Sequence, residues 1–244
     1  MGPYSVATYA ASRRADPRIG ALIRASLGSS RSVVNVGAGA GSYEPDDLDV
    51  VAVEPSAGMI AQRPPDAAPV VQARAEELPL ADDAADAAMA VLTIHHWSEL
   101  GRGLAELRRV ARRRVVVLHW EPALARRFWL VEEYLPEIAE YERDVVTPDE
   151  VGKLIGLPYE VVPVPLPQDC TDGFLGAYWR RPEAYLDATV RASISVFPAL
   201  GDAVAPGLER LRRDVESGAW AAAHADLLGR DELDVGYRLV VAGA

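Results

Sequence analysis

Three glycines at alternate positions follow an apolar run in the segment VVNVGAGAGSYEP, residues 33–45. Glycine at Gly37, Gly39 and Gly41 allows positive φ angles and lets a ligand approach the main chain closely. Glu54 ends the next apolar run, DVVAVE, and a carboxylate there can accept both hydroxyls of a ribose. Because ligands of open α/β sheets bind beyond the carboxyl ends of strands, this combination predicts a site for a ligand that contains a nucleoside.

The spacing of the glycines indicates which class of nucleoside ligand the loop would bind. In the dinucleotide fingerprint, G-x-G-x-x-G opens a helix whose amino end faces a pyrophosphate. Here the third glycine comes one position early, Ser42 occupies the fingerprint position, and Pro45 precedes two aspartates in a crossover too short for a full helix. A pyrophosphate would lose the helix dipole and meet acidic neighbours, whereas an uncharged or sulfonium group would not. A glycine-rich turn without a ligand remains an alternative.

A second segment, ARAEELPLADDAADAAMAVLTIHHW at residues 73–97, resembles the small-molecule methyltransferases that include the ubiquinone and biotin-pathway enzymes, methyltransferase type 11 of class I. The matching residues are Ala75, Glu76, Leu78, Pro79, Asp86, His95, His96 and Trp97. The resemblance covers about residues 30–120. It implies that S-adenosyl-L-methionine is the cofactor and that its methyl group goes to an O, N or C atom of a small molecule. It leaves specialised metabolism open as the setting.

Carried over by position, the resemblance implies a set of cofactor contacts. The residues concerned are Gly37, Ala38, Gly39 and Gly41 at the methionine and ribose, Glu54 at the ribose, Pro55, Ser56 and Met59 beside the adenine, Ala75 and Glu76 at the adenine edge, and Leu92 with its main chain at the methionine amine. Tyr9 and Arg13 resemble a Tyr-x-x-x-Arg element that closes over the cofactor, and a helix-surface position for Arg13 is the alternative.

The chain departs from the family pattern at three points. Asn35 stands where the family usually has Asp or Glu, which removes a charge beneath the glycine loop. Arg74 replaces the aspartate that usually precedes Ala75. The helix after the loop is expected to be truncated, which suggests a more open cofactor cleft.

Three of the four histidines are candidate catalytic residues for methyl transfer. They are His95, His96 and His119, which follow apolar runs on the predicted ligand side. We expect one of them to act as a base or to orient the substrate, with packing as the alternative for each. The segment after residue 121 is rich in aromatic residues: Phe128, Trp129, Tyr134, Tyr141, Phe174, Tyr178 and Trp179. They make an aromatic or apolar acceptor plausible, and helix packing is again the alternative reading.

The apolar runs alternate with helical patterns, which predicts a Rossmann-like, doubly wound α/β fold. The expected strands are 32–37, 49–54, 69–74, 86–92, 113–120, 159–166 and 236–242. This is a mostly parallel seven-stranded sheet whose last strand is antiparallel, with a helical cap inserted after the fifth strand. Helices are expected at about 4–27, through Leu100, Leu104, Leu107 and Ala111, at 128–143, from 147 to Gly156, and at about 181–230.

One domain over residues 1–244 is expected, with four parts. They are an amino-terminal helical lid (1–30), a cofactor-binding core (31–121), a substrate cap (122–190), and a carboxyl-terminal helix and strand (191–244).

Composition narrows the class of protein. A formal charge of −11 argues against a nucleic-acid partner, although five arginines between 108 and 114 lie close together, where they are expected to solvate a helix end. No apolar run approaches the roughly 20 residues that cross a bilayer, and no secretion signal is recognised, so we expect no membrane partner and a cytoplasmic location. A single cysteine, Cys170, excludes an internal disulfide or a cysteine-built metal site, and no metal is expected.

The oligomeric state cannot be read from the sequence, and three other functions stay open. They are a nicotinamide-dependent reductase, a protein that binds S-adenosylmethionine or S-adenosylhomocysteine without methylating, and an unrelated α/β binding protein.

Overall fold

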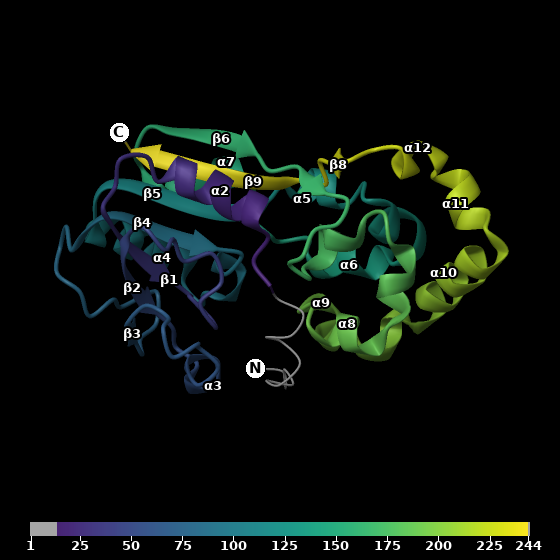
Figure 1. Cartoon of the computed structure of the whole chain (residues 1–244), viewed down its shortest axis with the longest axis horizontal. Helices are drawn as coiled ribbons and strands as arrows, with labels where there is room; N and C mark the ends of the chain where they lie inside the picture. The colour runs from purple at the N-terminus through teal and green to yellow at the C-terminus, as the bar shows by residue number, and fades with distance from the viewer. Residues whose placement is uncertain (1–13, 244) are drawn as a thin grey trace. The chain divides into compact units, whose positions relative to one another are not determined.

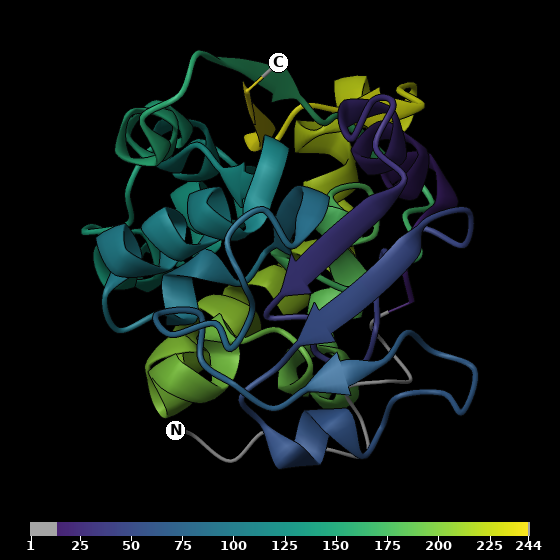
Figure 2. The same ribbon diagram turned by 90° about the vertical axis from the view of Figure 1, so that its left-hand side faces the viewer.

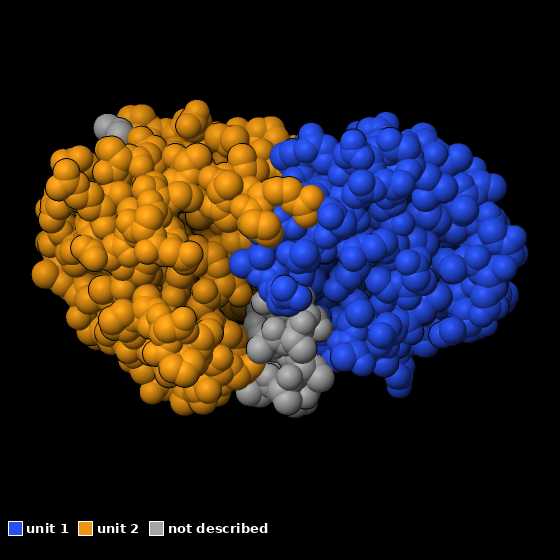
Figure 3. All heavy atoms as spheres, viewed as in Figure 1, with its two compact units in different colours: residues 1–16, 122–145, 165–236 blue, residues 17–121, 146–164, 237–244 orange. Residues whose placement is uncertain are grey.

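The computed structural model describes residues 14–243. These residues divide into two compact units, which are coloured separately in Figure 3. The sheet unit comprises residues 17–121, 146–164 and 237–243, and the helical unit comprises residues 14–16, 122–145 and 165–236. Each unit is described by itself below. The predicted subdivision into lid, core and cap stays a prediction.

A seven-stranded sheet forms the centre of the sheet unit, in the order β3-β2-β1-β4-β5-β9-β6. Its strands are β1 (Ser32–Val36), β2 (Asp49–Val53), β3 (Val70–Val71), β4 (Ala85–Val91), β5 (Ala111–Trp120), β6 (Tyr159–Pro163) and β9 (Tyr237–Gly243). Strand β9 runs antiparallel between β5 and β6, and the β1, β2, β3, β4 and β5 pairs are parallel. The order reverses between β1 and β4. This confirms the predicted doubly wound sheet with an antiparallel last strand.

Helices cover both faces of this sheet. Helix α2 (Pro17–Ser26) contacts β5 and β9 on one face, and α4 (Leu100–Val110) and α7 (Pro148–Ile155) lie on the other (Figure 1; Figure 2). The unit also contains α3 (Ala57–Ile60) and a 3-10 turn, η1 (Ile94–His96). Helix α7 begins with the predicted capping box, because Thr147 and Glu150 bond each other's main-chain N–H groups. It ends at Gly156, whose φ is 72°.

The core of the sheet unit follows the predicted periodicity. Leu104, Leu107 and Val110 on α4 are fully buried in one cluster with residues of β4, β5, α7 and β9. On β5, Val115 and Val117 point into this cluster. Alternate positions of β5 therefore face α4 and α7, as the two-residue period of a strand requires.

Several predicted boundaries differ from those of the structure. The helix expected at about 4–27 is not helical at 14–16 and begins at Pro17, because proline suits the first turn and disfavours helix in the residue before it. Residues 4–13 of that prediction lie outside the described residues. Ala111 belongs to β5 rather than to the preceding helix. Strand β3 has only two residues, β4 ends at Val91, and β6 ends at Pro163 rather than at residue 166.

Four arginines between residues 108 and 114, namely Arg108, Arg109, Arg112 and Arg114, bond other parts of the sheet unit. Arg109 donates to Leu78 O and Leu80 O and forms ion pairs with Glu106 and Asp82. The other contacts are Arg108 to Ile155 O and Gly156 O, Arg112 to Asp86 and Asp83 O, and Arg114 to Ser26 O. Carboxylates hold the pKa of Arg109 above its usual value. These arginines therefore join helices, strands and loops of the unit, a more specific role than the expected solvation of a helix end.

The helical unit consists of short helices and one small sheet. They are α5 (Pro122–Ala125), the π-helical turn η2 (Leu130–Tyr134), α6 (Pro136–Tyr141), β7 (Leu166–Pro167), η3 (Leu175–Tyr178), η4 (Pro182–Leu186), α8 (Ala188–Ala192), α9 (Val196–Leu200), η5 (Gly201–Val204), α10 (Ala205–Ser217), α11 (Ala219–Ala223), α12 (Ala225–Leu228) and β8 (Glu232–Leu233). The helical region predicted at 181–230 is thus divided at Gly201 and Gly218, both with positive φ. The β7–β8 pair was not predicted.

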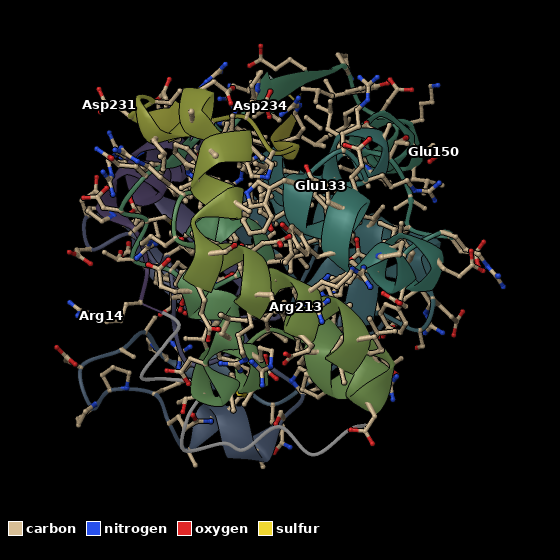
Figure 4. The ribbon with its side chains drawn as sticks, turned by 90° about the vertical axis from the view of Figure 1, so that its right-hand side faces the viewer. Arg14, Glu133, Glu150, Arg213, Asp231 and Asp234 are labelled. Carbon is tan, nitrogen blue, oxygen red and sulfur yellow. The ribbon has the colours of Figure 1, made fainter. Side chains whose placement is uncertain are left out.

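Aromatic side chains form the core of the helical unit. The indole of Trp129 is 5% exposed, donates to Trp179 O at 2.8 Å and packs edge-on against Tyr185 and Trp220. Trp179 is fully buried and donates to Leu166 O. Glu133, labelled in Figure 4, lies 3.3 Å from the ring of the neighbouring His224 in the same unit. Most of the aromatic residues that suggested an apolar acceptor are therefore packed against one another, which favours the packing alternative.

Among residues 14–243, none of the helices combines the length and the apolarity that a bilayer crossing requires.

We expect Gly207→Ala to lower the free energy of unfolding by about 2 to 4 kcal/mol, because α10 has no room for a methyl group there. A Cβ at Gly207 would lie 2.1 Å from Tyr134 O, a main-chain atom that cannot move aside alone. Urea unfolding measures the change. Gly229→Ala is the matched control: it meets nothing within 4 Å, and we expect a change within about 0.5 kcal/mol. Equal effects of the two substitutions would contradict this packing.

Candidate cofactor site

The loop after β1 is held tightly against the ends of β2 and β4. The N–H groups of Gly37 and Ala38 both donate to Val53 O, at 2.8 and 3.1 Å. Gly37 has a φ of 72°, and a Cβ there would lie 2.1 Å from Thr93 Oγ1. This glycine is therefore required both by its backbone conformation and by the close approach of the chain that follows β4.

Glu54 lies against this loop and is 7% exposed. Its Oε2 accepts the N–H of Gly39 and its Oε1 accepts the N–H of Ser56, both at 2.9 Å. Figure 2 shows β1 and β2 ending side by side at the edge where these groups lie. Each carboxylate oxygen has a second acceptor position, so two hydroxyls can be bound without breaking these bonds. The structure thus brings together the glycine loop and the acid that the sequence singled out.

No helix lies between Val36 and Asp49 in this described stretch of the chain. The loop instead contains four residues with positive φ, namely Gly37, Gly39, Gly41 and Tyr43. The predicted truncation of the helix is confirmed. A pyrophosphate at this loop would find neither a helix amino end nor a net positive charge.

A carboxylate and a guanidinium that we had not predicted lie beneath the loop. Glu44 and Arg63 form an ion pair at 2.8 Å, with side chains 10% and 4% exposed. Asn35 Nδ2 donates to Glu44 Oε1 at 3.2 Å. No local sequence signal indicated this pair, because its two members lie 19 positions apart and meet only through the tertiary fold.

The segment after Glu54 packs beside the loop. Ser56 caps α3, because its Oγ accepts the N–H of Met59 at 3.3 Å. The methyl group of Met59 lies so close to Gly39 that a Cβ there would be 3.3 Å from it. Pro55 is exposed at this edge. The predicted adenine contacts of Pro55, Ser56 and Met59 stay a prediction.

Glu76 is fixed by the amino end of α4. Its Oε1 accepts the N–H and Oγ of Ser98, at 2.7 and 2.8 Å, and the N–H of Glu99. Burial by itself raises the pKa of Glu76, but these bonds outweigh it and lower the pKa to about 2. The side chain therefore stabilises a helix end. The predicted adenine contacts of Glu76 and of the buried Ala75 stay a prediction.

Arg74, which replaces the usual aspartate, is an exposed side chain that donates to Ser98 Oγ at 3.0 Å. On the other side of the loop, Leu92 has a φ of 49° and donates its N–H to Leu118 O. A positive φ is rare for leucine, and such backbone conformations cluster at functional sites. The predicted main-chain role of Leu92 stays a prediction. Tyr9 and Arg13 lie outside the described residues.

The three candidate histidines have two different environments. His95 and His96 are exposed on η1, with ring centres 3.8 Å apart, and the ring of Trp120 lies edge-on to His95. His119 is completely enclosed, and its Nε2 lies 2.9 Å from Val146 O. Since a carbonyl can only accept, Nε2 carries the proton, and Nδ1 is buried without a hydrogen-bond partner among residues 14–243. Burial lowers the pKa of His119 to about 4.

His119 therefore ties β5 to the segment before α7, which favours the packing alternative for this residue, while His95 and His96 remain accessible. No group of three His, Cys, Asp or Glu side chains within residues 14–243 is arranged to hold a metal ion.

Comparisons with known proteins agree with this geometry. The model of the family described as "Methyltransferase domain" matches residues 34–118. A solved structure from Anabaena variabilis ATCC 29413, assigned as a methyltransferase from an antibiotic biosynthesis pathway, is 35% identical. The match covers 96% of this chain and 99% of that chain, with a TM-score of 0.87. No protein of curated function matches the sequence.

Two more distant structures share the fold. A SAM-dependent methyltransferase of Thermotoga maritima is 26% identical, over 62% of this chain and 75% of that one, with a TM-score of 0.50. Geranyl diphosphate C-methyltransferase of Streptomyces coelicolor A3(2), crystallised with Mg²⁺, geranyl diphosphate and S-adenosyl-L-homocysteine, is 15% identical. It covers 93% of this chain and 77% of that chain, with a TM-score of 0.53. At this identity the second likeness concerns the fold alone.

We expect the stability of the protein to fall between pH 7 and pH 5 by about 2 kcal/mol through His119 alone. An unfolded histidine titrates near pH 6.5, and folded His119 near 4, so the unfolded state binds more protons between these values. The stabilisation is complete above pH 6.5 and is lost as the pH falls toward 4. Urea unfolding at the two pH values measures it.

His119→Gln should remove this part of the pH dependence, because an amide can still donate to Val146 O but does not titrate. His95→Gln, at an exposed ring, is the control and should keep the wild-type dependence. The same slope in His119→Gln and in the wild type would contradict the assignment.

Proposed function

We propose that this chain, which belongs to the class I S-adenosylmethionine-dependent methyltransferases, methylates an O, N or C atom of a small-molecule acceptor. Its methyl donor is S-adenosyl-L-methionine. The proposal concerns the acceptor molecule and the atom that receives the methyl group. The relative from Anabaena variabilis, similar over nearly the whole of both chains, supports an acceptor from specialised metabolism.

One observation carries the proposed site: the buried carboxylate of Glu54 lies against the N–H of Gly39 at the edge where β1 and β2 end. A carboxylate here suits ribose hydroxyls. The loop has no following helix to bind a phosphate. An adenosyl group joined to a sulfonium therefore fits these residues better than a dinucleotide does, which argues against the reductase alternative.

The residues proposed to hold the donor occupy four segments of the sheet unit. They are Gly37, Ala38, Gly39 and Gly41 in the loop, Glu54, Pro55, Ser56 and Met59 after β2, and the main chain of Ala75, Glu76 and Leu92. When bound, the donor supplies an electrophilic methyl group on a positively charged sulfur. The proposed contribution of the chain is to fix the ribose through Glu54 and to hold the loop in place through the close packing of Gly37 against Thr93.

His95 and His96 are the proposed groups for the acceptor side. Both follow β4 on η1 and are exposed in the sheet unit, so either ring can take a proton from an acceptor hydroxyl or ammonium group. A phenolate or neutral amine needs positioning only. His119 is enclosed and bonded to Val146, so its proposed contribution is to the structure of the strand end.

Glu54→Gln should weaken binding of S-adenosylhomocysteine by about 30-fold. The substitution removes a negative charge, and the side-chain NH2 group of glutamine would face one of the two main-chain N–H groups that now donate to the carboxylate. Isothermal titration calorimetry on the full chain measures the affinity. Glu77→Gln, which makes the same change at an exposed position of the sheet unit, should keep the wild-type affinity. Binding of NAD in place of S-adenosylhomocysteine by the wild type would refute the proposed site.

Once an acceptor is found in a library of small molecules, at least one of His95→Ala and His96→Ala should lower kcat by about 100-fold. The affinity for S-adenosylhomocysteine should stay within about threefold, because neither ring is proposed to touch the donor. His119→Gln should retain turnover at neutral pH. Wild-type turnover in both alanine variants would leave the acceptor side without an assigned base.

A further inference from the structure

We infer that the Glu44–Arg63 ion pair is a positioning device that holds the glycine loop in the conformation that binds the donor. This inference rests on the proposed role of the loop. Arg63 Nη2 lies 2.9 and 2.8 Å from the two carboxylate oxygens of Glu44. Its side chain is 4% exposed, and Asn35 donates to the same carboxylate from β1. The pair therefore lies between the first strand, the loop and the segment after α3.

The pair contacts the loop at the residue that Glu54 also holds. Arg63 Nη1 donates to Gly39 O at 3.4 Å, and Nη2 donates to Ala68 O at 3.0 Å. The N–H of Gly39 is bonded to Glu54. A guanidinium thus holds the carbonyl of Gly39 and a carboxylate holds its N–H. Together they limit rotation of the two peptide groups that the donor must meet.

Gly41, the third glycine of the motif, lies against the Glu44–Arg63 ion pair. A Cβ at Gly41 would lie 3.3 Å from Arg63 Nη1 and 3.5 Å from Glu44 Oε2. Its φ is 98°, a conformation that other residues rarely adopt. A glycine at this position therefore leaves room for the ion pair.

The charge that Asn35 lacks is supplied by Glu44. A carboxylate at position 35 in addition to Glu44 would put two acids within hydrogen-bond distance, because Nδ2 of Asn35 is 3.2 Å from Oε1. Removing the charge of Glu44 instead would leave the buried guanidinium of Arg63 unpaired, which is strongly unfavourable. In this chain the carboxylate that pairs with the buried guanidinium comes from the crossover between β1 and β2, which contains no helix.

A set of variants that moves the negative charge from position 44 to position 35 tests this inference. The variants are Asn35→Asp, Glu44→Gln and the double variant, and calorimetry gives their affinity for S-adenosylhomocysteine. We expect each single variant to bind about tenfold or more weakly. The double variant should return to within about threefold of the wild type, because the new amide at position 44 can donate to the new carboxylate at position 35. Losses that add in the double variant would overturn the inference.

A second measurement separates positioning from a general effect on folding. Hydrogen exchange of the amides of residues 37–42 should accelerate in the single variants and slow again in the double variant, while the amides of β4 and β5 keep their protection. If only the thermal midpoint falls, and the folded single variants bind with wild-type affinity, the pair is structural and the inference fails. The matched control is Asp47→Asn, which breaks the exposed Arg24–Asp47 pair of the same crossover and should leave the affinity unchanged.

If the Glu44→Gln variant does not fold, the Arg63→Lys variant tests the inference instead. It keeps the charge but loses the planar fork that reaches Glu44 and Gly39 together, so we expect binding about tenfold weaker. Wild-type affinity in this variant would overturn the inference. Failure of the wild type itself to bind S-adenosylhomocysteine would instead contradict the proposed function, so the two failures are distinguishable.

Discussion

The carboxylate of Glu54 joins the ends of two neighbouring strands through main-chain hydrogen bonds, and the geometry of the site depends on it. Each of its oxygens accepts one N–H, from Gly39 and from Ser56, while the parallel pairing of β1 and β2 sets how far the loop can move. A buried carboxylate with only one bond per oxygen keeps capacity for further donors. A structural contact and a ligand contact can therefore share one side chain.

The sheet and the loop could be predicted because local signals agree with the fold. The runs of valine and alanine at β1, β2 and β4 are buried on both faces, and the missing helix was visible in the acidic, proline-containing crossover. The Glu44–Arg63 pair could not be predicted, since these residues lie 19 positions apart and meet only through the tertiary fold. The bond between Glu76 and Ser98 could not be predicted for a similar reason, because Ser98 lies at the beginning of another helix, 22 positions away.

The acceptor side shows a different limit of sequence patterns. Aromatic residues after position 121 suggested a lining for a pocket, but the helical unit buries Trp129, Trp179 and Tyr185 in its own core. A unit of short helices has few long apolar faces, so large flat rings fill its centre. Composition alone cannot separate these two uses. His119 illustrates the same point, because only the bond to Val146 distinguishes an enclosed ring from an accessible one.

The position of β9 has a consequence for biosynthesis. This strand pairs on both sides, with β5 and with β6, and residues 165–236 precede it in the chain. During translation, β5 and β6 are complete long before the strand that separates them emerges from the ribosome. Their unpaired edges are exposed during that time, and such edges favour aggregation. Pairing over this sequence distance also slows folding, so a nascent chain has reason to engage a chaperone until its last strand is in place.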